Sequence, residues 1–230
     1  MTQGKDAGKL LAGLDAAIHA AGELARRRVE AFRRHHADLS DAQLLRKLDK
    51  TFTTAVVSTG AATGAAAAVP GAGTGVALAA AAGDASSFLT AAATYVLAAA
   101  ELRGIRVETF EHERALVLLV LAGGGGSAFL TKAAGRTGPH LGKIVTNAVP
   151  LQTIRSVNKV LGANFVTRYG TKRGVLVLGK AAPFGVGFAI GAGGNLLMAK
   201  GVIKTAKTMF DAAEELNAAD RDDDPGHQTK

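Results

Sequence analysis

Two glycine-containing stretches have the residue types of nucleotide-binding loops. Gly174–Ala181 comes close to a phosphate-binding loop, in which glycines surround the phosphates and a Lys precedes Ser or Thr. Ala181, however, lacks the hydroxyl that would hold magnesium. The apolar run Ala115–Ala122 before Gly123–Gly126 imitates the strand and turn of a dinucleotide fold, but no acidic residue follows before position 211 to hold the ribose. We reject both motifs and interpret the second stretch as a helix that the glycines interrupt.

Histidine and serine chemistry is equally weak in this sequence. The segment Glu111–Arg114 contains a His-Glu pair, but Leu116 stands where a zincin helix needs its second His. His35 and His36 point to opposite sides of a helix, and no Gly-x-Ser-x-Gly elbow exists. The absence of Cys excludes a disulfide scaffold and a Cys-ligated metal site. We therefore expect no catalytic residue, no metal and no cofactor.

Asp84 is the only charged residue between positions 51 and 100. It is either an exposed or capping helix acid or a buried carboxylate, and burial requires a partner such as Arg114. We favour a structural pair over a catalytic group. With Asn195, these two residues also form the polar set of an alternative site.

The cations of the second half are the strongest compositional signal. The chain carries a net charge of +8, and between Arg114 and Phe210 it has thirteen Lys or Arg and no Asp or Glu. Only 5% of the residues are aromatic, which disfavours nucleic acid, whereas cations interleaved with apolar helix suit anionic phospholipid. The candidate lipid-binding residues are Arg136, Lys143, Arg155, Lys159, Arg168, Lys172, Arg173, Lys200, Lys204 and Lys207.

The elements that position these residues are predicted to be helices. Apolar or small residues recur every three or four positions over Lys9–His36, and period-2 alternation persists nowhere, so we expect an all-α fold. Ser40 and Asp41 predict a helix start, and Pro70–Gly73 is a break. The further expected helices are residues 41–69, 74–102, 109–122, a basic amphipathic stretch over 154–166, and 187–216.

Ala and Gly together account for 76 of the 230 residues, and several uncharged stretches approach the length of a membrane span. Pro70 and Asp84 disfavour spanning, because a carboxylate at the bilayer centre costs about 3 kcal/mol. Small residues spaced by four, such as Gly60 and Gly64, indicate close helix packing instead. We expect packed helices that lie on a membrane or partly enter it.

In order and spacing, several small-residue motifs over roughly 45–212 resemble the EcsC family. They are Pro70–Gly73, the Ala-rich helix with Asp84, Glu113-Arg114 before an apolar run, and Pro183–Asn195 followed by Ala206 and Phe210. The resemblance implies a mostly helical bacterial protein, named for one encoded beside an ABC transporter, with a membrane-linked accessory role and no established enzymatic activity. The residues Arg103–Arg106 depart from the family's Tyr-Gly-aromatic-Asp turn, because Arg106 stands where the family has Asp. Whatever role that Asp has in the family is therefore in doubt for this chain.

We thus expect a flexible N-terminus over 1–8, one all-α domain over 9–216 and a disordered acidic tail over 217–230. The expected function is non-enzymatic, peripheral binding of anionic membrane lipid at the inner face of the membrane of a bacterial cytoplasm, with a membrane protein as a further candidate partner. The absence of Cys and of a signal-cleavage site fits that location. The alternatives are a lipid-cavity protein or hydrolase around Asp84, and a membrane-inserting pore-forming or interaction protein.

Overall fold

The computed structural model describes residues 2–67, 73–105, 107, 109–122, 155, 158–159, 162 and 186–222. The described part of the chain forms α1 (Thr2–His35), α2 (Asp41–Ala67), α3 (Gly73–Leu102), α4 (Phe110–Ala122) and α8 (Val186–Asp222). It contains no strand, which confirms the all-α prediction. Most of the expected amphipathic stretch over 154–166 lies outside the described residues.

The helix bounds match the expectation closely except at the two ends of the chain. α1 begins at Thr2 rather than at Lys9, and α8 continues to Asp222 rather than ending at Leu216. The helical backbone therefore runs into both segments that we expected to be flexible or disordered. Within α1, the predicted apolar face is correct, because Leu14, Ile18 and Val29 are all buried.

Local hydrogen bonds explain where two of the helices begin and end. Before α2, the amide of Ser40 donates to Gln43 Oε1 at 2.8 Å while the amide of Gln43 donates to Ser40 Oγ at 3.4 Å, which is a capping box. At the end of α3, the amide of Ile105 donates to the carbonyl of Ala100 at 2.9 Å, and that of Gly104 to the carbonyl of Glu101 at 3.1 Å. Gly104 has a φ of 70°, so this end is a Schellman motif.

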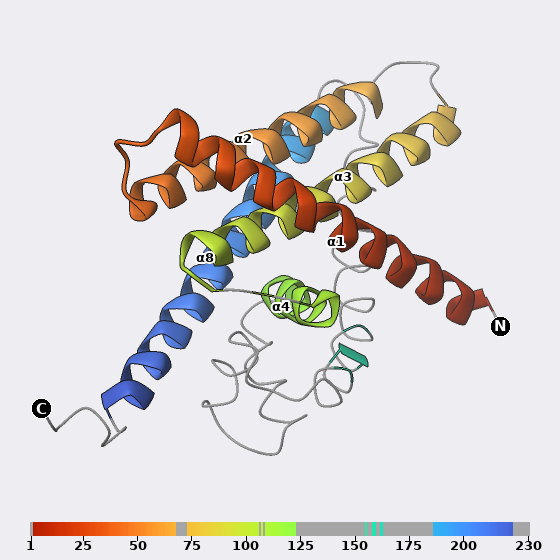
Figure 1. The fold of residues 1–230 in the computed structure, drawn as a ribbon. Coiled ribbons are helices and arrows are strands. Elements are labelled where there is room, and N and C mark those ends of the chain that lie inside the picture. The colour runs from red at the N-terminus through yellow and green to blue at the C-terminus, as the bar shows by residue number, and fades with distance from the viewer. Residues whose placement is uncertain are drawn as a thin grey trace, which may run out of the picture.

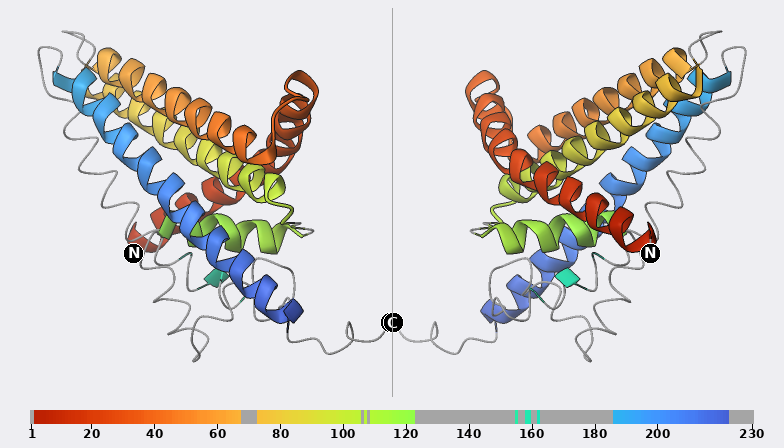
Figure 2. Two further views of the ribbon diagram at one scale, coloured as in Figure 1. Left: turned by 90° about the vertical axis from the view of Figure 1, so that its left-hand side faces the viewer. Right: turned by 90° about the vertical axis from the view of Figure 1, so that its right-hand side faces the viewer.

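In space, α2 and α3 lie side by side, α1 crosses in front of them, and α8 runs behind them (Figure 1). The C-terminal end of α2 and the N-terminal ends of α3 and α8 gather at one end of the molecule (Figure 2). We call this end the apolar arm and define it as residues 51–67, 73–100 and 186–199. Asp84 is the only charged residue in these three segments.

α4 packs across the other end of the layer, against α1, α3 and α8. Its six residues from Ala115 to Val120 are all buried, as expected for a helix that is apolar on every side. Since this run is helical, it is not the strand of a dinucleotide-binding unit. The rejection of that motif is therefore confirmed for the part of it that the structure describes.

One helical segment of the described chain, Gly83–Leu102, is long and apolar enough to cross a membrane by length and composition. Within the fold, 67% of it is buried, and the core helix of a soluble protein has the same properties. This segment is thus weak evidence for a span. The buried Gly60 and Gly64 of the neighbouring α2 are consistent with the close helix packing that the sequence predicts.

A matched pair of glycine substitutions tests the α3 terminus. Gly104→Ala should destabilise the fold by about 1–2 kcal/mol, because a Cβ is unfavourable in the left-handed region. Gly13→Ala, inside α1 where nothing lies within 4 Å of an added Cβ, should stabilise it by up to about 1 kcal/mol through helix propensity. Urea unfolding measures both. Equal signs for the two variants would contradict the Schellman assignment.

Candidate functional site

Two of the three predicted polar groups meet inside the apolar arm. Asn195 of α8 is fully buried, and Asp84 of α3 is 3% exposed. Asn195 Nδ2 donates to Asp84 Oδ1 at 3.0 Å and to the carbonyl of Val56 in α2 at 2.9 Å. One side-chain amide therefore joins three helices and hydrogen-bonds the only charged group of the arm.

Arg114, the third predicted group, lies elsewhere. Its Nε donates to Asp15 Oδ1 of α1 at 2.6 Å, and its Nη1 donates to the carbonyl of Asn158 at 3.3 Å. The suggested pairing of Asp84 with Arg114 is therefore wrong. Spacing along the sequence could not reveal that Arg114 pairs with Asp15, because the two residues are 99 positions apart and the Asp15 side chain is partly exposed on α1.

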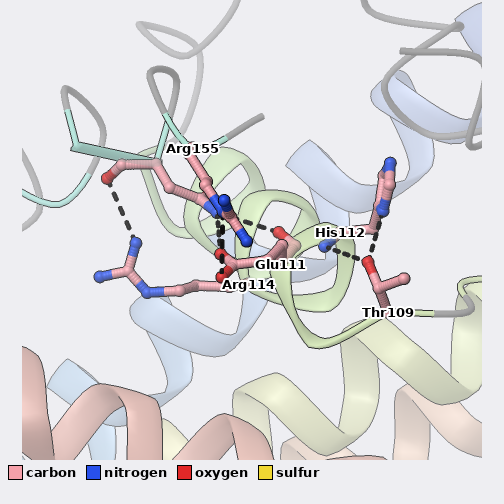
Figure 3. A network of polar contacts seen from close by, with 6 residues as sticks. Thr109, Glu111, His112, Arg114 and Arg155 are labelled. Atoms are coloured by element: carbon pink, nitrogen blue, oxygen red, sulfur yellow. Dashed lines mark hydrogen bonds and ion pairs between the residues drawn. The ribbon is translucent and has the colours of Figure 1, made fainter. Parts of the chain in front are cut away.

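A polar network surrounds the first turn of α4 (Figure 3). Thr109 precedes this helix, its Oγ1 lies 2.6 Å from His112 Nδ1, and the amide of His112 donates to the same oxygen at 3.4 Å. On the other side of the turn, Asn158 Nδ2 donates to the carbonyl of Glu111 at 3.0 Å, and Arg155 Nε lies 3.9 Å from Glu111 Oε1. The network caps α4 and joins Asn158 and Arg155 to its first turn.

Thr109 was predicted from the sequence as the start of this helix, but Asn158, which is 3% exposed, was not predicted as part of the site. Within the described part of the chain, His112 Nε2 and Asn158 Oδ1 are buried without a hydrogen-bond partner. The pattern Thr-x-x-His at a helix start could have indicated the contact between Thr109 and His112. Nothing in the sequence indicates the contact between Asn158 and Glu111.

The predicted lipid-binding cations separate into paired and unpaired groups. Lys207 Nζ lies 2.6 Å from Asp49 Oδ2, and Arg155 faces Glu111, so both have a carboxylate partner. Lys159, Lys200 and Lys204 are exposed and form no ion pair with any described residue. The other five candidates lie outside the described residues: Arg136, Lys143, Arg168, Lys172 and Arg173.

Two exposed lysines of α8 stand beside an exposed apolar side chain. Leu197 is 72% exposed and lies one turn before Lys200, which in turn lies one turn before Lys204. These three residues occupy the side of α8 opposite its buried residues, such as Asn195, Ala199 and Ala206. The structure thus produces a small amphipathic surface that the sequence analysis did not single out, because Leu197 reads there as one more core residue.

A separate cleft of about 490 Å³ lies between α1, the end of α3 and the start of α4. Its lining includes Glu101, Glu113, Arg26 and Arg33. Burial raises the pKa of both carboxyls above their usual range, and the guanidinium of Arg26 opposes this. Arg26 Nη1 is 4.0 Å from Glu113 Oε1, so this pair is long and does not offset the burial of the carboxylate.

None of the described residues forms a group of three His, Asp or Glu that could hold a metal ion. Neither this cleft nor the second described cavity is lined by Asp84, Arg114 or Asn195. No family model matches the sequence, and no similar curated protein or solved structure was found.

Asn195→Ala should destabilise the fold by about 3 kcal/mol, because it leaves a buried carboxylate and a buried carbonyl each without this donor. Lys204→Ala, on the exposed side of the same helix, should stay within about 0.5 kcal/mol of the parent protein. Chemical unfolding followed by circular dichroism compares them. Similar effects from both variants would mean that the Asp84–Asn195 contact does not hold the arm together.

Glu113→Gln should stabilise the protein at pH 7. The pKa of Glu113 is raised in the folded protein because burial favours the neutral carboxyl. The contribution of this carboxyl to folding stability is therefore fully present below its unfolded pKa of about 4.3, and it is lost as pH rises through the folded pKa. The advantage of the variant should therefore grow from pH 4 to pH 7 in urea unfolding.

Glu23→Gln provides the opposite control, because hydrogen bonds from Arg27 and Arg26 lower the pKa of Glu23. The contribution of the ionised Glu23 carboxylate to folding stability is present above its unfolded pKa and is lost as pH falls through its folded pKa. Parallel pH profiles for the two variants would refute the assignment.

Proposed function

We propose that the protein is a non-enzymatic, peripheral membrane protein that binds anionic phospholipid reversibly. The observation that carries this proposal is the surface formed by Leu197, Lys200 and Lys204 on α8, where an exposed apolar side chain stands beside two unpaired cations. In interfacial helices the apolar group enters the boundary of the acyl chains while the lysines remain among the headgroups.

Charge along α8 limits the contact to the first half of the helix. Residues 186–199 carry no charge and Lys200 and Lys204 follow, but the exposed face later presents the carboxylate of Glu215. Asp211 on the same face is paired with Arg103 at 2.6 Å, so the repulsion from an anionic surface falls mainly on Glu215. The favoured orientation therefore brings the N-terminal half of α8, and the apolar arm to which it belongs, toward the lipid.

Two lysines contribute about 2 kcal/mol near an anionic surface, which is too little for stable anchoring alone. Lys159, which is exposed and unpaired in the described chain, and the candidates outside it would add to this attraction. Nucleic acid is the weaker partner, since the largest aromatic side chains of the described part, such as Phe88 and Phe210, are buried and offer no stacking surface.

The resemblance to the EcsC family agrees with this role. It motivates the further proposals that the protein is bacterial and acts from the cytoplasm at the inner face of the membrane, with a membrane protein as an additional partner. A hydrolase around Asp84 is less well supported, because Asp84 is buried and hydrogen-bonded to a buried amide.

Co-sedimentation with vesicles tests the lipid proposal. Binding should require anionic lipid, weaken as salt rises, and fall about thirtyfold in Lys200→Gln/Lys204→Gln, which removes about 2 kcal/mol of attraction. Leu197→Ser should weaken binding without changing its salt dependence.

The matched control is Arg46→Gln/Lys50→Gln, which removes two exposed α2 cations with the same spacing and the same change in net charge. This variant should bind like the parent protein. Equal binding to neutral and anionic vesicles, no binding at 150 mM salt, or equal losses in the two double variants would overturn the proposal.

A further inference from the structure

A groove of about 400 Å³ lies between α1, α2 and α3, and its described lining contains no residue of α8. Its apolar lining includes Leu24, Leu48 and Phe52, and its other wall is the α3 stripe of Ser87, Thr90, Ala91 and Thr94. The volume falls within the roughly 300–1,000 Å³ of small-molecule sites. We call it the α3 groove.

The groove exists because the side chains on this stripe of α3 are small. Positions 87, 90, 91 and 94 follow the spacing of one helix face, and all four carry Ser, Thr or Ala. α1 crosses α3 here and does not fill the hollow, so Leu24 is left 47% exposed. Only one other large apolar side chain of the described residues, Leu197, is so exposed.

Arg28 lines the groove as its one cation. Its neighbours have partners: Arg26 and Arg27 both contact Glu23, at 3.2 and 2.7 Å. Arg28 is only partly exposed and forms no ion pair or hydrogen bond with any described residue. A half-buried guanidinium beside apolar surface favours an anionic ligand, because few other groups offset its loss of hydration.

The floor of the groove does not repel an anion. Phe52 and Tyr95 stack there with ring centroids 4.7 Å apart. The Tyr95 hydroxyl donates to Asp49 Oδ1 at 2.8 Å, and Lys207 Nζ lies 2.6 Å from Asp49 Oδ2. Burial, with help from the Asp49 carboxylate, raises the pKa of Tyr95, so the phenol stays neutral. The Asp49 carboxylate beside the floor is therefore already paired.

We propose that the α3 groove binds a medium-chain fatty acid, with the acyl chain against the accessible side chains of Leu24 and Ala91 and the carboxylate at Arg28. The lining follows α3 from Ser86 to Tyr95, a length of about 13 Å, which suits an extended chain better than a broad ring system. Ser86 and Ser87, both exposed, supply hydroxyl donors along the same wall. This inference goes beyond the proposed membrane binding and depends on none of its residues.

Isothermal titration tests the site in the intact chain, with dodecanoate kept below its micelle concentration and dodecanol below its solubility limit. Dodecanoate should bind at least tenfold more tightly than the neutral alcohol, since a charge-assisted contact is lost. Arg28→Gln should lower dodecanoate affinity about tenfold and leave dodecanol unchanged. Arg27→Gln, an adjacent arginine already paired with Glu23, is the matched control and should bind like the parent protein.

Ala91→Leu should abolish binding of both probes by filling the groove. If that variant unfolds, Ser87→Leu at an exposed position replaces it. Equal affinity for the acid and the alcohol, equal loss in Arg27→Gln and Arg28→Gln, or full binding in a folded groove-filling variant would each overturn the proposal. Tighter binding of dodecyltrimethylammonium than of dodecanoate would also do so, because it would indicate a cation site.

Discussion

The buried amide of Asn195 is the contact on which the helical layer depends. A layer built from Ala and Gly has few large side chains to fix the position of one helix against the next, so packing alone specifies it weakly. Asn195 Nδ2 has directional bonds to Asp84 on α3 and to the Val56 carbonyl on α2. These bonds fix the register of three helices at one level. A slip of α3 or α8 would leave the buried Asp84 carboxylate without this donor, and a slip of α2 would leave the Val56 carbonyl without it.

A second acid repeats the arrangement nearer the other end of the layer. Asp49 of α2 accepts from Tyr95 of α3 and pairs with Lys207 of α8, so the same three helices are joined again. On α2 the two levels are seven residues apart, about 10 Å. One consequence concerns function, because Lys207 serves this structural pair and is not free for lipid. A count of cations in the sequence overstates the charge that the surface can present.

The helices and their boundaries could be predicted from the sequence because their signals are local. Ser40 with Gln43, the break at Pro70–Gly73 and the spacing of Leu14, Ile18 and Val29 depend on residues a few positions apart. The partners of the polar groups depend instead on how distant helices pack. Asp84 is buried and accepts a hydrogen bond from an amide 111 residues away, whereas Arg114, the cation suggested for it, bonds Asp15. Of the candidate cations, the sequence could not separate Lys200 from Lys207, because the difference is a carboxylate on another helix.

The scarcity of large side chains explains both the exposed surface of α8 and the α3 groove. Where helices run side by side, as α2, α3 and α8 do, small residues allow close contact and leave little space. α1 crosses α3 at an angle and contacts it closely, and a hollow remains beside this contact, next to Leu24 and Arg28. The groove therefore combines an apolar lining with a cation, Arg28, that forms no ion pair with any described residue. The two proposed sites therefore differ in kind, since the fatty-acid site lies beside a helix crossing and the lipid-binding surface lies on the exposed face of α8.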